Sequence, residues 1–475
     1  MEAEDEWKIE MKHWEQCCIY RVPEWMKDIA NCKAYKPSLV KLGPLGEDRG
    51  QAHYRMEEHK RRAMMRLVKR SGKPLEEFIA AIEQEEVVNK LRGAYGYLGA
   101  KWNKWESSRF IITMLTDGCF LLEIMGIFTR GENLKNYAPN DPVFSKRGFS
   151  SLYLSLRSDM IVMENQIPLL VLQKILEVIG DKAPIPVDRL NHTVLEFLGY
   201  KGWKTKEILC CHALDILHES FIAGREEMPS EKEETLLRAF LLRFLKTLGW
   251  PAGRPLRRSI LRVFGLDRYL AIQLPWRVQS KQAQKEASDV WEEATMPCAT
   301  DLSEAGVRFR KNQSNSVLDV DFKHGVLSMP LVVVNNGSEK EWLNLMAFER
   351  LHYDAGTNVT AYMIFMDNLI STERDVELLI SKGLIINLLS SNEEAAKLFN
   401  KLSKGAVMVP SSKLNLVRRR LNAHCAKAWN KWRANFVQTY LSNPWVFISL
   451  VAAVFLLVAT FLQTIYTVLP FYTRS

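Results

Sequence analysis

The sequence predicts a mainly α-helical protein with a small antiparallel β-hairpin or sheet, an α+β arrangement, followed by one C-terminal transmembrane helix. Apolar residues recur at helical spacing along most of the chain, as in residues 107–127. One region, residues 307–334, instead alternates apolar and polar side chains with the two-residue period of strands. Near the C-terminus, the 25 residues from Trp445 to Leu469 carry no charge. These three patterns define the predicted fold class and the order of its parts.

The composition is that of a globular protein with one large or two medium domains. Of the 475 residues, 47% are hydrophobic and 25% are charged, and the formal net charge is +9. This charge is spread along the chain, which favours anionic membrane surfaces, so no nucleic-acid partner is expected. The eight cysteines show no CxxC pair and no repeated spacing, as expected for thiols kept reduced in the cytosol.

Residues 1–433 are predicted to form a predominantly helical cytosolic domain. The acidic N-terminus lacks the apolar core of a secretory signal, and Glu2 stands where N-myristoylation requires glycine. We expect the charged helix at 51–70 to lie on the surface and the helix at 107–127 to lie in the core. Residues 225–300 are basic without sustained periodicity, and we interpret them as an insertion or a linker.

The strand region shows charge on its polar positions. Val307 and Phe309 alternate with arginines, and Val320 and Phe322 alternate with aspartates. An antiparallel pairing across the loop KNQSNS would set these arginines against the aspartates, each pair contributing a few tenths of a kcal/mol. Gly325 would then turn the chain into a third strand. We therefore assign the aspartates to the surface of a sheet and not to a metal site.

Two helices after the strands have recognisable ends. Thr372 precedes Asp375, and Ser391 precedes Glu394, by the three residues that a capping box requires. Gly383 stands where a left-handed C-terminal cap is needed. The pattern predicts helices at 373–382 and 392–402.

The C-terminal region is predicted to cross a membrane once. At about 1.5 Å per residue, the uncharged span at 445–469 exceeds the roughly 30 Å hydrocarbon thickness. Basic residues precede the span, whereas only Arg474 follows it in the short tail at 470–475, so the large N-terminal part should remain cytosolic. We expect a tail-anchored protein of the plasma membrane in preference to the endoplasmic reticulum.

A juxtamembrane segment at 434–444 joins the cytosolic domain to the span. Before it, tryptophans alternate with basic residues that suit anionic lipid headgroups. The expected membrane-interface residues are Arg418, Arg419, Arg420, Lys427, Trp429, Lys431, Trp432, Arg433 and Trp445. The alternative is a solvated helix whose tryptophans pack on the cytosolic domain.

A polar triplet interrupts the stretch SDMIVMENQIPLLVLQKILEVIG. Pro168 cannot donate a backbone hydrogen bond and crowds the carbonyl of Glu164, so a helix must stop or kink there. From Pro168, as the first helical residue, the sequence predicts a helix that is buried on most sides. Glu164, Asn165 and Gln166 then lie where backbone groups lack helical partners, and we expect their side chains to satisfy a buried helix junction. A functional carboxylate at Glu164 is the alternative.

Searches for catalytic motifs find no dinucleotide fingerprint, P-loop, nucleophile elbow or HExxH zinc motif. In CCHALDILHESF, His212, Asp215 and Glu219 would form a polar stripe of ligand-competent side chains on a helix. The plain interpretation is an amphipathic helix. No cofactor and no metal site is therefore expected. Four glycosylation sequons lie at Asn191, Asn312, Asn336 and Asn358. They would be used only if the domain lay in a lumen.

Several ordered segments resemble the plant family called domain of unknown function 247. They are CIYRVPEWM, AYKPSLVKLGPL, MIVMENQIPLLVLQKIL, CHALDIL, DLSEAGVRFR, LDVDFKHGVLSMPLVV, NLMAFER and the C-terminal apolar segment. The chain departs from the family at GPLGED, Gly43 to Asp48, where a Tyr-His-His-Gly-like run is common, which puts any role of those histidines in doubt here. The resemblance implies a single-pass plant membrane protein without established enzymatic activity, and certain relatives are linked to self-incompatibility in grasses.

Two classes of function follow from these observations. The favoured one is a membrane-tethered recognition, signalling or scaffold protein that contacts the lipid bilayer and an unidentified protein partner, with homo-oligomers remaining open. It is not expected to be an enzyme. The alternatives are an enzyme with an unfamiliar site near Glu164 or the His212, Asp215 and Glu219 stripe, and an oligomeric membrane pore.

Overall fold

The computed structural model describes most of the chain outside one long central segment. The described residues are Trp7, Glu10, Met11, Trp102 and the ranges 13–29, 31–45, 50–98, 107–130, 136–180, 186–224, 296–314, 316–406, 412–427 and 444–472. Contacts divide the chain into one unit of Met1–Glu226 with Met296–Ser475 and another of Glu227–Thr295. The predicted insertion or linker at 225–300 lies almost wholly outside the described residues.

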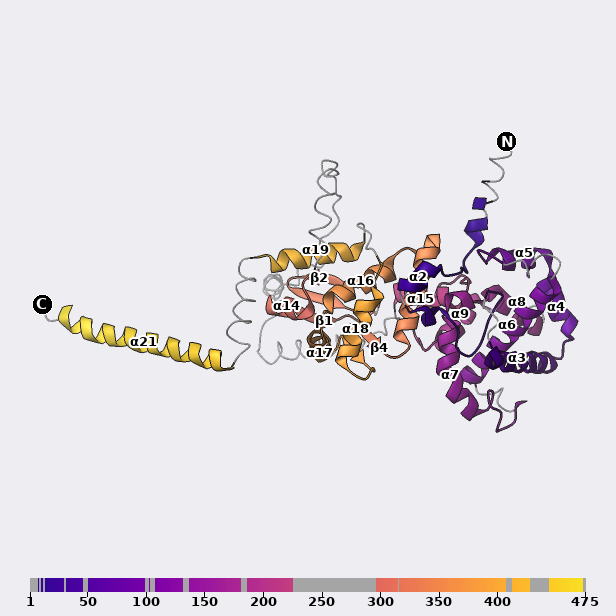
Figure 1. Cartoon of the computed structure of the whole chain (residues 1–475), viewed down its shortest axis with the longest axis horizontal. Helices are drawn as coiled ribbons and strands as arrows, with labels where there is room; N and C mark the ends of the chain where they lie inside the picture. The colour runs from indigo at the N-terminus through magenta and orange to yellow at the C-terminus, as the bar shows by residue number, and fades with distance from the viewer. Residues whose placement is uncertain are drawn as a thin grey trace, which may run out of the picture. The chain divides into compact units, whose positions relative to one another are not determined.

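The first half of the described chain is helical and is organised around α6 (Figure 1). This helix, Ser107–Arg130, packs against α3, α4, α8 and α9, so the predicted core position of 107–127 is confirmed. The elements are α2 Glu24–Ile29, η1 Cys32–Tyr35, α3 Gly50–Ser71, α4 Leu75–Glu83, α5 Glu85–Gly93, α7 Lys146–Met160, η5 Met163–Asn165, α8 Leu169–Ile179, α9 Val187–Phe197 and α10 Ala213–Ala223. The charged helix α3 is not wholly on the surface, because Met56, Met64 and Leu67 are buried.

The second half combines helices with short strands. Its helical elements are α14 Ala299–Glu304, α15 Ser338–Leu351, η7 Tyr353–Ala355, α16 Asn358–Leu369, α17 Glu373–Ser381, α18 Asn392–Leu402 and α19 Lys413–Cys425. Its strands are β1 Arg308–Lys311, β2 Asp321–Lys323, β3 Val326–Met329, β4 Val332–Val334 and β5 Ile385–Asn387. The predicted class, mainly helical with a small sheet, is confirmed.

The three-stranded sheet has the order β1-β3-β2. β2 and β3 form the predicted antiparallel hairpin, and His324 and Gly325 turn it with φ of 52° and 74°. The predicted antiparallel pairing of the arginine strand with the aspartate strand is wrong, because β1 runs parallel to β3. β3 takes the central position since its Leu327 and Met329 are buried. A second pair, β4 and β5, is parallel.

The helix ends predicted after the sheet are confirmed. Thr372 and Asp375 form a capping box at α17, and the Ser391 hydroxyl accepts the Glu394 N–H at α18. Gly383 follows α17 with φ of 70°, in the left-handed region. These local signals therefore fix the ends of α17 and α18, between which the short strand β5 lies in the chain.

Two described helices are long and apolar enough to cross a membrane. In the window Ser108–Phe128 of α6, 78% of the residues are buried within the protein. In the window Trp445–Ile465 of α21, which runs from Pro444 to Tyr472, 0% are buried. Only a helix without protein cover needs lipid around its apolar side chains. α6 is therefore a core helix, whereas α21 could be a membrane span.

Candidate functional site

The polar triplet lies at a break between two helices, as predicted. α7 ends at Met160, η5 covers Met163–Asn165, and α8 begins at Leu169. Pro168 precedes α8 as its N-cap with φ of −60° and ψ of 134°, so the helix begins at Leu169, one residue later than predicted. α8 buries most of its apolar side chains, which confirms a helix enclosed on most sides. The break therefore lies inside the protein, where each backbone polar group needs a partner.

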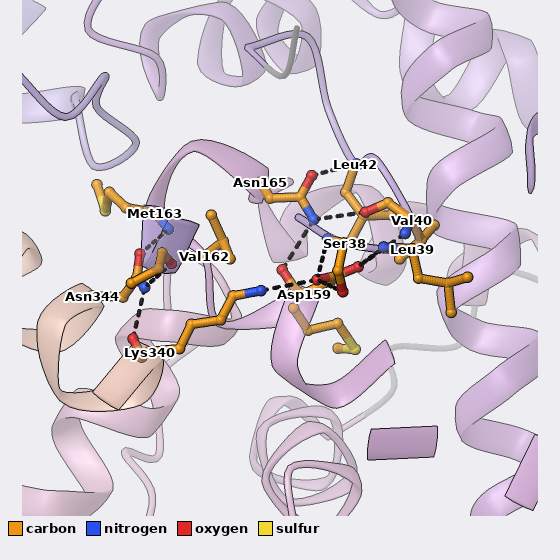
Figure 2. Close-up of polar contacts among 12 residues, drawn as sticks. Ser38, Leu39, Val40, Leu42, Asp159, Val162, Met163, Asn165, Lys340 and Asn344 are labelled. Carbon is orange, nitrogen blue, oxygen red and sulfur yellow. Dashed lines mark hydrogen bonds and ion pairs between the residues drawn. The ribbon is translucent and has the colours of Figure 1, made fainter. Parts of the chain in front are cut away.

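A buried aspartate that the sequence analysis did not single out organises this junction. Asp159 is 0% exposed and lies in the last turn of α7. Its Oδ1 accepts hydrogen bonds from Ser38 N at 2.8 Å and Ser38 Oγ at 3.1 Å. Its Oδ2 accepts from Leu39 N at 2.7 Å and Val40 N at 2.9 Å (Figure 2). Lys340 Nζ completes the set, 3.0 Å from Oδ1.

This arrangement explains how a carboxylate is tolerated at a buried helix C-terminus. The helix dipole disfavours negative charge at that end, and burial adds a larger cost. Three backbone N–H groups, one hydroxyl and one ammonium face the two oxygens of Asp159, so the charge is compensated from several sides. The sequence contained one signal for this role of Asp159. It is an acidic residue in the last turn of a helix, just before an apolar run.

Asn165 joins the same N-terminal segment to the end of α7. Its Oδ1 accepts from Leu42 N at 2.7 Å, and its Nδ2 donates to Val40 O at 3.1 Å and Asp159 O at 3.0 Å. An amide side chain can donate and accept at once, as a backbone peptide does. Asn165 thus takes the place of a neighbouring strand for residues 40–42, a role that neither aspartate nor leucine could fill.

Gln166 and Glu164 attach two further segments. Gln166 Nε2 donates to Met160 O at 2.6 Å and Val162 O at 2.7 Å, and its Oε1 accepts from Leu214 N in α10 at 3.2 Å. Glu164 Oε1 accepts from Val22 N at 2.8 Å and lies 2.9 Å from Lys27 Nζ. The predicted role for the triplet, satisfying a buried junction, agrees with these contacts.

Helix α15 contributes the second side of the junction. Asn344 Oδ1 accepts from Met163 N at 2.9 Å, and its Nδ2 donates to Ala34 O at 2.9 Å. In Figure 2, Asn344 and Lys340 approach from α15 while residues 38–42 approach Asp159 and Asn165 from the other side. The junction therefore links four regions of sequence, near residues 22–42, 159–166, 214 and 340–344, into one polar cluster.

A buried ion pair lies beside this cluster. Asp117 Oδ1 is 2.7 Å from Lys60 Nζ, and Asp117 Oδ2 accepts from Gly43 N at 2.7 Å. Gly43 has φ of 67°, and a Cβ there would lie 2.5 Å from the carbonyl oxygen of Gln166. Glycine is therefore required at 43 by both conformation and close approach. The other described residues of the GPLGED departure are Pro44 and Leu45, and residues 46–48 lie outside the described residues.

The geometry of the junction leaves little room for a reactant. A cavity of about 10 Å³ borders Asn165 and Gln166, which is the space of one water molecule. The oxygens of Asp159 and the amides of Asn165 and Gln166 are bonded to protein groups. Such a cluster is suited to holding segments together, because a catalytic carboxylate needs space for the group on which it acts.

The proposed stripe of His212, Asp215 and Glu219 does not converge on one site. α10 begins at Ala213, so His212 is its N-cap, with Nδ1 accepting from Asp215 N at 3.1 Å and Nε2 2.9 Å from Cys18 O. Burial lowers the pKa of His212 to about 4, so the ring is neutral at pH 7. Glu219 instead pairs with Lys206 at 2.7 Å. Within the described ranges, no group of three or more His, Cys, Asp or Glu could hold a metal ion.

The predicted membrane-interface residues are only partly described. Arg418, Arg419 and Arg420 lie on α19, and Lys427 follows that helix. Arg420 is directed toward the sheet, where its Nη1 lies 3.6 Å from Asp321. Trp445 lies in the first turn of α21 and is 78% exposed. Trp429, Lys431, Trp432 and Arg433 and the segment 434–443 lie outside the described residues.

Comparison with known proteins identifies relatives along nearly the whole chain. A family model described as plant protein of unknown function, domain of unknown function 247, matches residues 19–459. The UPF0481 protein At3g47200 of Arabidopsis thaliana is 28% identical and covers 96% of this chain and 87% of its own length. At3g02645 of the same plant, which carries the same UPF0481 designation, is 24% identical, with 94% and 89% covered. No solved structure gives a significant match.

Proposed function

The chain belongs to the plant family of domain of unknown function 247, and from this premise we propose that it is a membrane-anchored recognition, signalling or scaffold protein. It acts through contacts of its cytosolic part with a protein partner. The family match runs over residues 19–459, so it includes both the polar junction and the first part of α21. Self-incompatibility-type recognition, implied for certain relatives, is one such role.

The exposed apolar surface of α21 is the observation that carries this proposal. Its window Trp445–Ile465 has 0% of its residues buried, although α6 has a comparable length and is covered by protein. An apolar helix of 21 residues without protein cover is unfavourable in water and favourable in a bilayer. Lipid is the environment that satisfies it.

The polar groups of α21 favour a role as a membrane tether and not as part of a pore. The hydroxyls of Thr460 and Thr464 donate to the carbonyl oxygens of Leu456 and Thr460, each at 2.8 Å. Ser449 bonds to Trp445 O in the same way at 2.9 Å. These hydroxyls are satisfied within their own helix, so they need no neighbouring helix and no water-filled channel. Asp, Glu, Lys, Arg and His, the usual marks of an ion path, do not occur in 445–469.

The polar clusters in the part of the chain before α21 favour a binding function and not a catalytic one. The carboxylate of Asp159 and the triplet at 164–166 are used to hold segments together, and His212 serves as a helix cap. A cytosolic position also suits Asn191, since its amide is 0% exposed and donates to Lys206 O and Ile208 O. A glycan could not be attached there without unfolding this region.

Replacement of residues 445–469 by 25 leucines tests the tether. If the span only anchors the protein, the variant should remain in the membrane fraction and should retain the partners that co-purify with the wild type from plant membranes. A chain truncated before Pro444 should leave the membrane fraction while keeping those partners. Loss of the partners in the polyleucine variant, at normal abundance and location, would show that the span itself does specific work.

A further inference from the structure

A second cavity, separate from the polar junction, is lined mainly by aromatic rings. It has a volume of about 80 Å³ and lies between α10, α15, α16 and the segment 330–333. Val333 on this segment is 43% exposed. The rings are those of Tyr200, Trp203, Phe221, Trp342 and Tyr362. This volume is several times that of one water site, so it fits a small organic group.

The rings are inclined to one another and pack edge to face where they line the cavity. The centroid of Phe221 lies 4.9 Å from that of Trp342 and 5.3 Å from that of Trp203, with interplanar angles of 66° and 58°. Tyr200 and Trp203 are 5.1 Å apart at 75°. Steeply inclined rings present π-faces in several directions, and a π-face carries partial negative charge.

Two polar groups complete the lining. Glu341 is largely buried, accepts a hydrogen bond from the Tyr200 hydroxyl and lies 3.3 Å from Arg157 Nη2. Burial raises the pKa of Glu341, against the opposing effects of Arg157 and Tyr200. The hydroxyl of Tyr362 is buried and has no hydrogen-bond partner among the described residues. A buried hydroxyl without a partner is unfavourable, which indicates that something else satisfies it.

From this lining we propose that the cavity is a binding site for a quaternary or methylated ammonium group. Aromatic boxes attract such cations through the ring quadrupoles, and their diffuse, weakly hydrated charge is easily desolvated. Glu341 offsets the charge of Arg157, with which it pairs, so the guanidinium does not repel such a cation. The Tyr362 hydroxyl can donate to an oxygen atom carried by the ligand, as in choline. Arg157 already lies over the Tyr200 ring, 5.3 Å from its centroid, so the other aromatic rings of the lining are the ones left for the ligand.

This site is independent of membrane anchoring, and binding to the full-length chain tests it. The protein is purified in a maltoside detergent, which has no ammonium group, and titrated calorimetrically with choline. The neutral isostere 3,3-dimethylbutan-1-ol, which has carbon in place of nitrogen, is the control ligand. We expect saturable choline binding at least about tenfold tighter than binding of the alcohol. Equal affinities, or the absence of saturable choline binding, would overturn the proposal.

Variants locate the binding to the cavity. Trp203→Leu and Glu341→Gln should each weaken choline binding by about tenfold. Trp25→Leu, at an exposed tryptophan of α2 outside this cavity, is the matched control and should bind as the wild type does. Thermal unfolding confirms which variants are folded, and Trp203 lies on a connecting segment where leucine should be accommodated. Unchanged affinity in folded Trp203→Leu would contradict the proposal.

Glycerophosphocholine distinguishes the two possible ligands, the headgroup of a choline lipid and a free methylated ammonium compound. Affinity equal to or above that of choline would identify the headgroup of a choline lipid, because the glycerophosphate portion is then accommodated. Affinity more than about tenfold lower would identify a free methylated ammonium compound. Both results place the ammonium group in the same aromatic cavity.

Discussion

Lys340 Nζ lies 3.0 Å from Asp159 Oδ1, and this contact joins helices that are 181 positions apart in the chain. The aspartate is fully buried, whereas the lysine side chain is 15% exposed. The same carboxylate binds the backbone N–H groups of Ser38, Leu39 and Val40. One side chain thus connects α7, α15 and an N-terminal segment that has little secondary structure of its own.

Replacing Asp159 should be more damaging than replacing its partner. In Asp159→Asn, the amide NH₂ would face groups that are themselves donors, and the charge that Lys340 balances would be lost. We expect a loss of about 3–5 kcal/mol, the cost of breaking a buried pair. Lys340→Met should cost less, since the backbone and hydroxyl donors remain. Thermal unfolding of the detergent-solubilised chain measures both, with Lys90→Met on the exposed face of α5 as control; wild-type unfolding of Asp159→Asn would contradict this role.

Asn165→Leu tests whether the triplet is structural. The substitution removes partners from Leu42 N, Val40 O and Asp159 O, each worth about 1–3 kcal/mol when left buried and unsatisfied. The folded yield and the midpoint of thermal unfolding should therefore fall. Pro168→Ala is the neighbouring control and should change little, because alanine adopts the same backbone conformation. Equal behaviour of the two variants would show that the hydrogen bonds of Asn165 do not matter.

His212 should make the protein less stable at mildly acidic pH. Its pKa is about 4 in the folded chain and 6.5 when exposed, so between these values the unfolded chain binds a proton that the folded chain does not. The free energy of unfolding is therefore not reduced by His212 above pH 6.5, and it decreases as the pH falls toward 4, by about 3 kcal/mol in total. Asn at 212 can still cap α10 but does not titrate. His212→Asn should reduce the difference in unfolding midpoint between pH 7 and pH 5; an unchanged difference would assign the effect elsewhere.

Two glycines with similar φ angles distinguish the cost of a left-handed backbone conformation from the cost of a steric collision. Gly43 and Gly383 have φ of 67° and 70°, but only at Gly43 would a Cβ collide, 2.5 Å from Gln166 O. Gly383→Ala should cost about 1–2 kcal/mol for the left-handed conformation alone. Gly43→Ala should cost clearly more, because backbone at the junction must also move. Similar losses of stability in the two variants would show that the contact with Gln166 is not tight.

The sequence predicted those features that depend on neighbours in the chain. Pro168 ends a helix through its own ring, and Thr372 and Ser391 cap helices that begin at the next residue, so local chemistry was sufficient. The apolar span of α21 was also evident, because it depends on composition over one continuous stretch. Glu164, Asn165 and Gln166 were recognised because they interrupt an apolar run.

Features that depend on distant partners were missed. Asp159 was not singled out, since its donors are about 120 and 181 residues away. The parallel pairing of β1 with β3 was missed because adjacent strands favour hairpins, and the burial of Leu327 in the central strand decided the order. His212 was assigned to a helix face although its ring caps the helix and contacts Cys18 from another segment.

Membrane topology is the most direct test of the proposed function. The full-length chain with an epitope tag after Ser475 is inserted into sealed microsomes and treated with protease. We predict that the tag is protected, that the chain before Arg433 is digested, and that the exposed sequon at Asn336 carries no glycan. A protected N-terminal domain with a glycan at Asn336, or a chain extracted by alkaline carbonate, would contradict a cytosolic recognition domain held at the membrane by α21.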